Sequence, residues 1–81
     1  MNLYLISQDV NEDYDTYDSA VVVAKNAHEA RHMHPGGYKL DTPTTDLNDG
    51  TWAQPKDVRV KLIGTTKDKI PGVICASFNA G

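Results

Sequence analysis

Residues 19–37, SAVVVAKNAHEARHMHPGG, decide the fold because they join a strand to a short helix. The first part, Ser19 to Lys25, is a continuous β-branched run, which is typical of a strand covered on both faces. Asn26 is a good N-cap, and Glu29 three residues later completes a capping box. Pro35 and the two glycines after it then end the helix, which leaves about two turns.

Three more stretches predict strands on either side of this unit. They are Leu3 to Ser7, Asp57 to Gly64 and Gly72 to Phe78. In the second of them Val58, Val60 and Leu62 alternate with charged residues, which indicates a half-exposed strand. Cys75 in the last stretch is expected to be a small buried core residue. The sequence therefore predicts an α+β domain, a small antiparallel sheet of four strands in the order β-β-α-β-β with the short helix packed on one face. The other face would be covered by the long 36–55 loop or by a second copy of the protein.

The length and composition limit the classes of function. A chain of 81 residues forms a single domain, residues 1–81, with a thin core. Its net charge is −3 with only eight Lys and Arg, so we expect no direct binding of nucleic acid. One cysteine suits a reducing cytosol, and no apolar run has membrane-spanning length or the form of a signal peptide. We predict no cofactor.

The helix contains His28-Glu29-Ala30-Arg31-His32, which matches the H-E-x-x-H pattern of zinc proteases. That chemistry needs both histidines on one face, a third ligand and a walled cleft. The helical periodicity instead places Ala27, Ala30 and Met33 on the buried side and the histidines opposite. We therefore interpret His28 and His32 as solvent-facing and predict no metal site, with this pair as the residual candidate. His34 is expected to pack at the end of the helix.

The run Asp9-x-Asn11-x-Asp13 resembles the start of an EF-hand loop. Tyr14 stands where that loop requires glycine, and Ala20 where it requires a bidentate Glu. The pattern therefore argues against calcium binding.

An acidic segment interleaved with tyrosines follows the first predicted strand. Tyrosine rings contribute contact area at low entropy cost, and carboxylates steer a basic partner. The segment predicts a partner-binding surface made of Glu12, Asp13, Tyr14, Asp15, Tyr17 and Asp18. A solvated acidic turn with its tyrosine rings packed on the sheet edge is the alternative. Tyr38 and Trp52 are a possible second surface.

The runs Tyr14 to Val22 and Glu29 to Arg31, together with Trp52 and the Gly72 to Gly81 tail, resemble a family of small proteins encoded by bacteriophages and prophages. The resemblance implies an accessory protein expressed in the host bacterial cytoplasm. Such proteins often bind and disable a host defence component, for example a CRISPR–Cas or nucleotide-signalling system.

The leading hypothesis is accordingly a non-enzymatic, anti-CRISPR-like inhibitor. Its partner would be a bacterial host protein with a basic surface, with no direct nucleic acid and no membrane involved. The alternative is a homo-oligomeric sponge for a signalling nucleotide, with Arg31, Lys39, Lys56 and Arg59 as the available cations. A zinc hydrolase built on the H-E-x-x-H residues is the third hypothesis. A homodimer is compatible with the first two.

Overall fold

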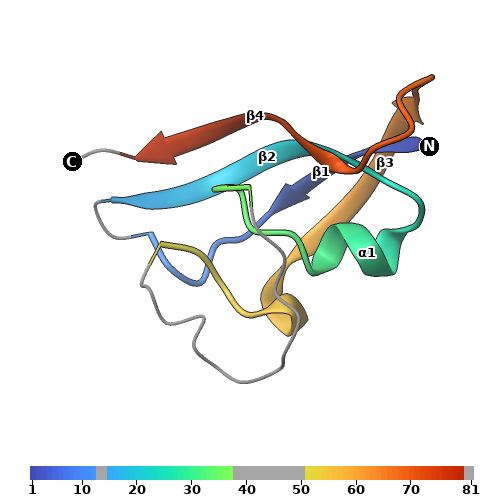
Figure 1. Ribbon diagram of the computed structural model, residues 1–81. Coiled ribbons are helices and arrows are strands. Elements are labelled where there is room, and N and C mark those ends of the chain that lie inside the picture. The colour runs from blue at the N-terminus through green and yellow to red at the C-terminus, as the bar shows by residue number, and fades with distance from the viewer. Residues whose placement is uncertain (13–14, 38–50, 80–81) are drawn as a thin grey trace.

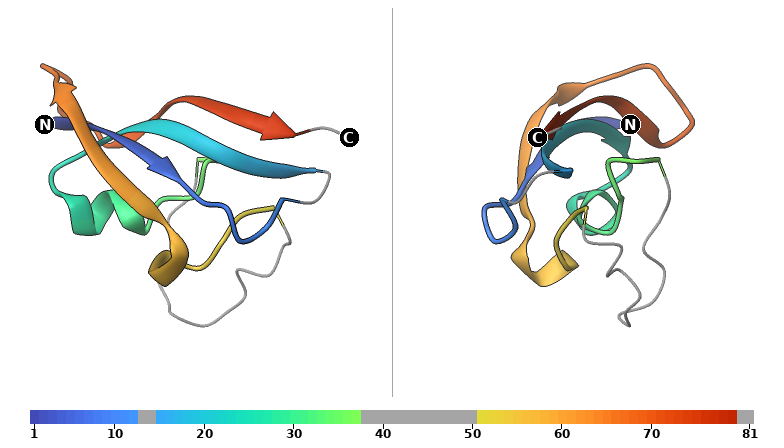
Figure 2. Two further views of the ribbon diagram at one scale, coloured as in Figure 1. Left: turned by 180° about the vertical axis from the view of Figure 1, so that it is seen from behind. Right: turned by 90° about the vertical axis from the view of Figure 1, so that its left-hand side faces the viewer.

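A computed structural model of the chain describes residues 1–12, 15–37 and 51–79. Its four strands form one antiparallel sheet in the order β3-β1-β2-β4. The elements are β1 (Asn2–Ser7), β2 (Thr16–Ala24), α1 (Ala27–Arg31), the 3₁₀ turn η1 (Pro55–Asp57), β3 (Arg59–Thr65) and β4 (Gly72–Asn79). The sheet curves over α1 and η1, which lie on the same side of it (Figures 1 and 2).

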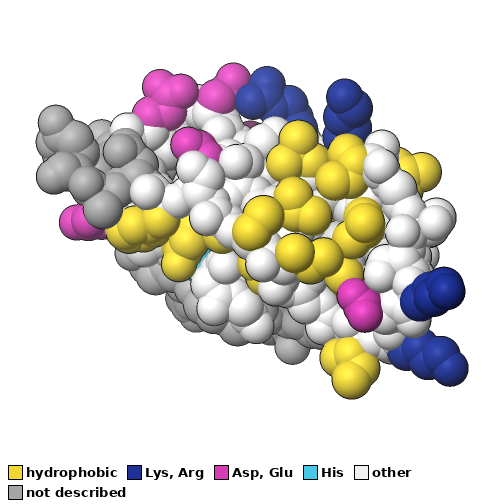
Figure 3. All heavy atoms as spheres, turned by 90° about the horizontal axis from the view of Figure 1, so that it is seen from above, with side chains coloured by type: hydrophobic (Ala, Val, Ile, Leu, Met, Phe, Trp, Pro, Cys, Tyr) yellow, Lys and Arg dark blue, Asp and Glu magenta, His cyan; other side chains and the backbone are white. Residues whose placement is uncertain are grey.

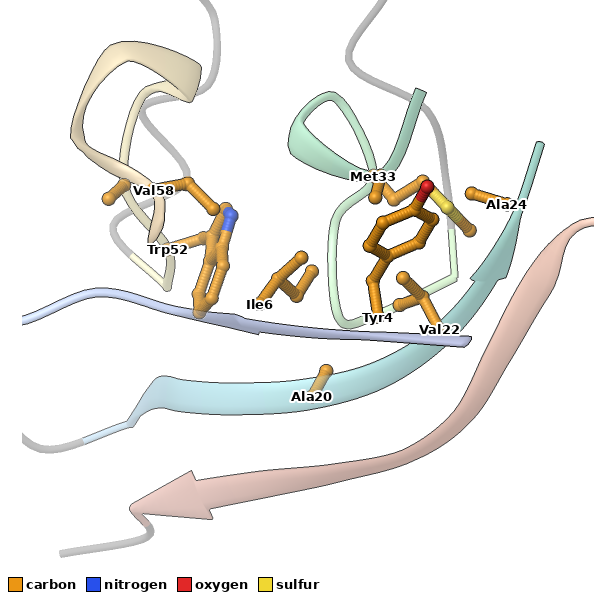
Figure 4. Packing of buried hydrophobic residues seen from close by; sticks show 10 residues of the cluster. Tyr4, Ile6, Ala20, Val22, Ala24, Met33, Trp52 and Val58 are labelled. Carbon is orange, nitrogen blue, oxygen red and sulfur yellow. The ribbon is translucent and has the colours of Figure 1, made fainter. Parts of the chain in front are cut away.

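The hairpin of β1 and β2 forms the centre of the sheet. Its register pairs Tyr4 with Val22 and Ile6 with Ala20, so these side chains share one face. They are buried together with Ala24, Ala30, Met33, Trp52, Ala53 and Val58 in one hydrophobic core, of which Figure 4 shows the packing. The core therefore lies between the central strands on one side and α1, Trp52 and Val58 on the other.

The helix α1 begins where the capping box predicts. Asn26 Oδ1 accepts the N–H of Glu29 at 2.8 Å, and Glu29 Oε1 accepts the N–H of Lys25 at 3.0 Å. The helix ends at Arg31, four residues before Pro35, because its last turn tightens. The N–H of His32 donates to the carbonyl of Glu29, and that of Met33 to the carbonyl of Ala30. Ala30 and Met33 are buried as predicted, whereas Ala27 is exposed.

The α+β class, the four antiparallel strands and the one short helix agree with the sequence prediction. The predicted element order β-β-α-β-β is not exact, because η1 stands between α1 and β3. Arg31 links these elements: its Nη1 donates to the carbonyl of Val58 and, at 3.5 Å, to that of Pro55.

Two predictions about the edge strands are wrong. The register of β1 with β3 pairs Val60 with Ile6 and Leu62 with Tyr4, so Leu62 shares a face with Val60 as predicted, and the register shift falls beyond it, between Leu62 and Gly64. Leu62 is nevertheless 58% exposed, because β3 is an edge strand, whereas its side chain was expected to be buried with those of Val58 and Val60. Cys75 is exposed because it pairs with Val21, between the core residues Ala20 and Val22, and so lies on an edge strand with its side chain on the face opposite the core.

Candidate binding surface at the acidic end

Four of the predicted contact residues lie at the end of the sheet where β1 leads into β2. Glu12, Asp15 and Asp18 are exposed there, and Tyr17 is half-buried beside them. Asp15 adopts a left-handed conformation with φ 62°, which aspartate tolerates better than most residues. We refer to Asp9, Glu12, Asp15 and Asp18 as the acidic end.

A buried glutamine holds the first part of this end in place. Gln8 is 4% exposed, and its Oε1 accepts the N–H groups of Val10 at 2.9 Å and Asn11 at 2.8 Å. Its Nε2 donates to the carbonyls of Asn11 at 2.7 Å and Tyr17 at 2.9 Å. One side chain thus satisfies four backbone groups from two segments, so the start of the connection is tied to β2.

On the side of the sheet that carries α1, three aromatic rings pack together at the acidic end. The ring of Tyr17 meets that of Phe78 edge-on at a centroid distance of 4.8 Å and that of His34 at 5.7 Å. His34 is 3% exposed; its Nδ1 accepts the N–H of Gly36, and its Nε2 lies 3.0 Å from Thr51 Oγ1. Since Nδ1 is an acceptor, these contacts assign the neutral ring with its proton on Nε2.

Backbone hydrogen bonds connect residues 51 and 52 to the same end. The N–H of Tyr17 donates to the carbonyl of Thr51 at 2.8 Å, and Asn11 Nδ2 donates to that of Trp52 at 3.2 Å. These two hydrogen bonds therefore connect the acidic end to the segment that leads into η1.

Within residues 1–12, 15–37 and 51–79, the carboxylates at this end have few cationic neighbours. Among the described residues, the ion pair at this end is Arg59 with Asp9, at 3.4 Å, and both side chains are largely exposed. Asp18 Oδ1 accepts the hydroxyl of Ser19 at 2.8 Å. An exposed pair contributes little stability in water, so the surface keeps its negative character for a partner.

The remaining predicted site residues do not join this surface. Asp13, Tyr14 and Tyr38, and with them the predicted cation Lys39, lie outside the described residues. Trp52 is 4% exposed and packs in the core near Ile6 and Val58, so its proposed role as an exposed second surface is corrected (Figure 4). Its Nε1 has no hydrogen-bond partner within the described segments.

The two motif histidines lie side by side on α1, with ring centroids 4.4 Å apart. His32 Nδ1 lies 2.8 Å from the carbonyl of His28 and, as its donor, keeps only Nε2 for a ligand. No group of three or more His, Cys, Asp or Glu side chains with metal-binding geometry occurs in residues 1–12, 15–37 and 51–79. The pair thus supplies two ligands where a zinc site takes at least three.

Two of the cations considered for a nucleotide are engaged elsewhere. Arg31 donates to the backbone carbonyls of Pro55 and Val58, and Arg59 pairs with Asp9. These contacts leave Lys56, which is exposed, as the remaining candidate within the described residues.

Two residues that organise the surface were missed by the sequence prediction. No role was predicted for Gln8, which follows the first predicted strand. Phe78 was predicted only to lie in the last strand. The pairing of Tyr17 with Phe78 follows from the register of β2 with β4, which no local pattern reveals. Asp9 was considered in the EF-hand pattern but was not proposed as a contact.

Comparison of the chain with protein-family models, with curated proteins and with solved structures found no match. In the described part of the chain, no helix is long and apolar enough to span a membrane.

Proposed function

We propose that this protein is a binding protein that inhibits a bacterial host protein by docking its acidic end onto a basic surface of that partner. The observation that carries the proposal is that Glu12, Asp15 and Asp18 are exposed at the end of the sheet where Gln8 ties the start of the β1–β2 connection to β2. A connection fixed in this way loses less conformational entropy on binding than a mobile one.

The half-buried Tyr17 suits the centre of such a surface. Its ring is fixed by Phe78 and His34, so its exposed part offers contact area without reordering. The carboxylates around it would steer a cationic partner and supply acceptors for Arg and Lys side chains.

The resemblance of the sequence to small phage and prophage proteins supports a host defence protein, of the CRISPR–Cas or nucleotide-signalling kind, as the partner. This choice of partner rests on that resemblance, whereas the choice of surface rests on the arrangement of side chains.

The test begins by capturing partners from a bacterial lysate with the purified protein and identifying them by mass spectrometry. Binding of the strongest partner is then compared between the wild type and an Asp15→Asn/Asp18→Asn variant. Since two steering charges are lost, we expect association to slow by about tenfold at low salt and by much less at high salt.

The matched control is Asp68→Lys, which changes the net charge by the same two units at an exposed position in the turn before β4, at the other end of the sheet. We expect it to bind like the wild type. Equal association rates for both variants would remove the acidic end from the interface, and capture of no protein would contradict the proposed activity.

A further inference from the structure

The free edge of β4 differs from every other part of the sheet. Within the described residues, β4 pairs only with β2, so the backbone N–H and C=O groups along its other edge face outward. The strand has eight residues, Gly72–Asn79, none of which is charged and none of which is proline. Ile74 and Phe78 are 55% and 44% exposed.

The opposite edge of the same sheet is protected in the usual way. β3 carries Arg59 and Lys61, both exposed, and charged side chains discourage the addition of another strand. A long apolar edge without such residues is a template for pairing with a further strand. The two edges therefore indicate that β4, and not β3, accepts one.

The distribution of charge at the two ends of β4 indicates which strand pairs with its free edge. The acidic end lies where β4 finishes. At the other end of the sheet, Lys25 follows β2, and Lys67 and Lys69 flank Asp68 in the turn that leads into β4, which leaves this end with a net positive charge among these residues. Figure 3 shows hydrophobic side chains gathered over the exposed sheet face and most Asp and Glu side chains toward one end. Lys and Arg side chains lie at the opposite end and also along one long edge. A second copy related by a two-fold axis runs antiparallel and brings its lysines beside the first copy's carboxylates.

We propose that two copies of the chain associate through antiparallel pairing of their β4 strands, which forms one continuous eight-stranded sheet. The pairing satisfies the outward-facing backbone groups of both strands. It also places Ile74 of each copy at the interface. The area is that of a single pair of strands, below about 1,200 Å², so the dimer dissociates on dilution.

Sedimentation of the purified chain over roughly 1 µM to 1 mM, spanning the range of weak interfaces, tests this inference. We expect a monomer–dimer equilibrium for the wild type and at least a tenfold larger dissociation constant for Ile74→Lys. Ile63→Lys is the matched control, since Ile63 is 48% exposed and lies on β3, at the opposite edge of the sheet. A wild type that is monomeric throughout, or an Ile74→Lys variant that dimerises like the control, overturns the proposal. If Ile74→Lys does not fold, as judged by circular dichroism, Ser77→Lys takes its place.

Disulfide crosslinking tests the pairing itself. In a symmetric antiparallel pair, the residue at the axis faces its own copy at a Cα separation of about 4.5–5.5 Å, which a disulfide spans. Cys75 is compared with Ala76→Cys and Ser77→Cys, each in a Cys75→Ser background, and with Lys61→Cys in that background on β3. We expect mild oxidation to link one β4 position selectively. Equal linking through Lys61→Cys, or none through any β4 position, contradicts the pairing. Both experiments use the purified chain alone, so they are independent of the proposed inhibitory function.

Discussion

At the scale of single residues, Gln8 shows how a buried polar side chain defines a surface. Its amide forms hydrogen bonds with three backbone groups of Val10 and Asn11, in a part of the chain without regular structure, and with the carbonyl of Tyr17 in β2. A buried amide with all these partners costs little, whereas each partner left unpaired in the interior costs about 1–3 kcal/mol.

Substituting Gln8→Met keeps the length of this side chain but removes its hydrogen-bonding atoms. We expect the free energy of unfolding to fall by about 2–4 kcal/mol, because the N–H groups of Val10 and Asn11 lose their acceptor. Urea denaturation measures the loss. Gln54→Met is the control, since Gln54 is exposed and its side chain makes no capping hydrogen bond to η1. A cost below about 0.5 kcal/mol for Gln8→Met, the range of ordinary surface substitutions, would show that water replaces the amide.

At the scale of the elements, α1 has only five residues, so its capping contacts carry much of its stability. Asn26→Ala removes the side chain that accepts the N–H of Glu29, and we expect it to cost about 1 kcal/mol. The thermal midpoint of unfolding reports the change. His28→Ala, at an exposed helix position, is expected to leave the midpoint nearly unchanged. An Asn26→Ala variant as stable as the wild type would mean that packing alone maintains the helix.

The elements also show what the sequence could predict. Local patterns located the four strands and the start of α1, because alternation, β-branching and capping act over a few residues. They did not identify β4 as an edge strand, since GVICASF has the apolar character of a central strand. Its position depends on pairing with β2, whose residues lie 49 to 63 positions earlier in the sequence, and this pairing determines the exposure of Cys75. The equally long-range pairing of β3 with β1 determines that of Leu62.

The acidic surface was predictable to a similar extent. The carboxylates of Glu12, Asp15 and Asp18 were identified from composition, because a run of acids in a turn-forming segment is rarely buried. The residues that pack against Tyr17 beside these carboxylates were not identified from the sequence. His34, Thr51 and Phe78 reach Tyr17 from three separate segments, and only the folded chain brings them together.

At the scale of the whole molecule, the core lies on one side of the sheet and is built chiefly on β1 and β2. In hydrogen exchange at low protein concentration, we expect the amides of these two strands to exchange slowest and those of β4 to exchange markedly faster. Nuclear magnetic resonance resolves the amides individually. Equal protection of β1, β2 and β4 in the dilute protein would show that the sheet opens only as a unit.

The order β3-β1-β2-β4 also has a consequence for synthesis on the ribosome. The central hairpin is complete once Ala24 has emerged, and hairpins form within about 1–10 µs. Both flanking strands come from the second half of the sequence. At a translation rate of about 5–20 residues per second, both edges of the hairpin therefore stay unpaired for seconds. Throughout that interval the carboxylates of its own turn are already present. The acids that we assign to a partner surface would therefore also keep the nascent chain from pairing with its neighbours on the same messenger.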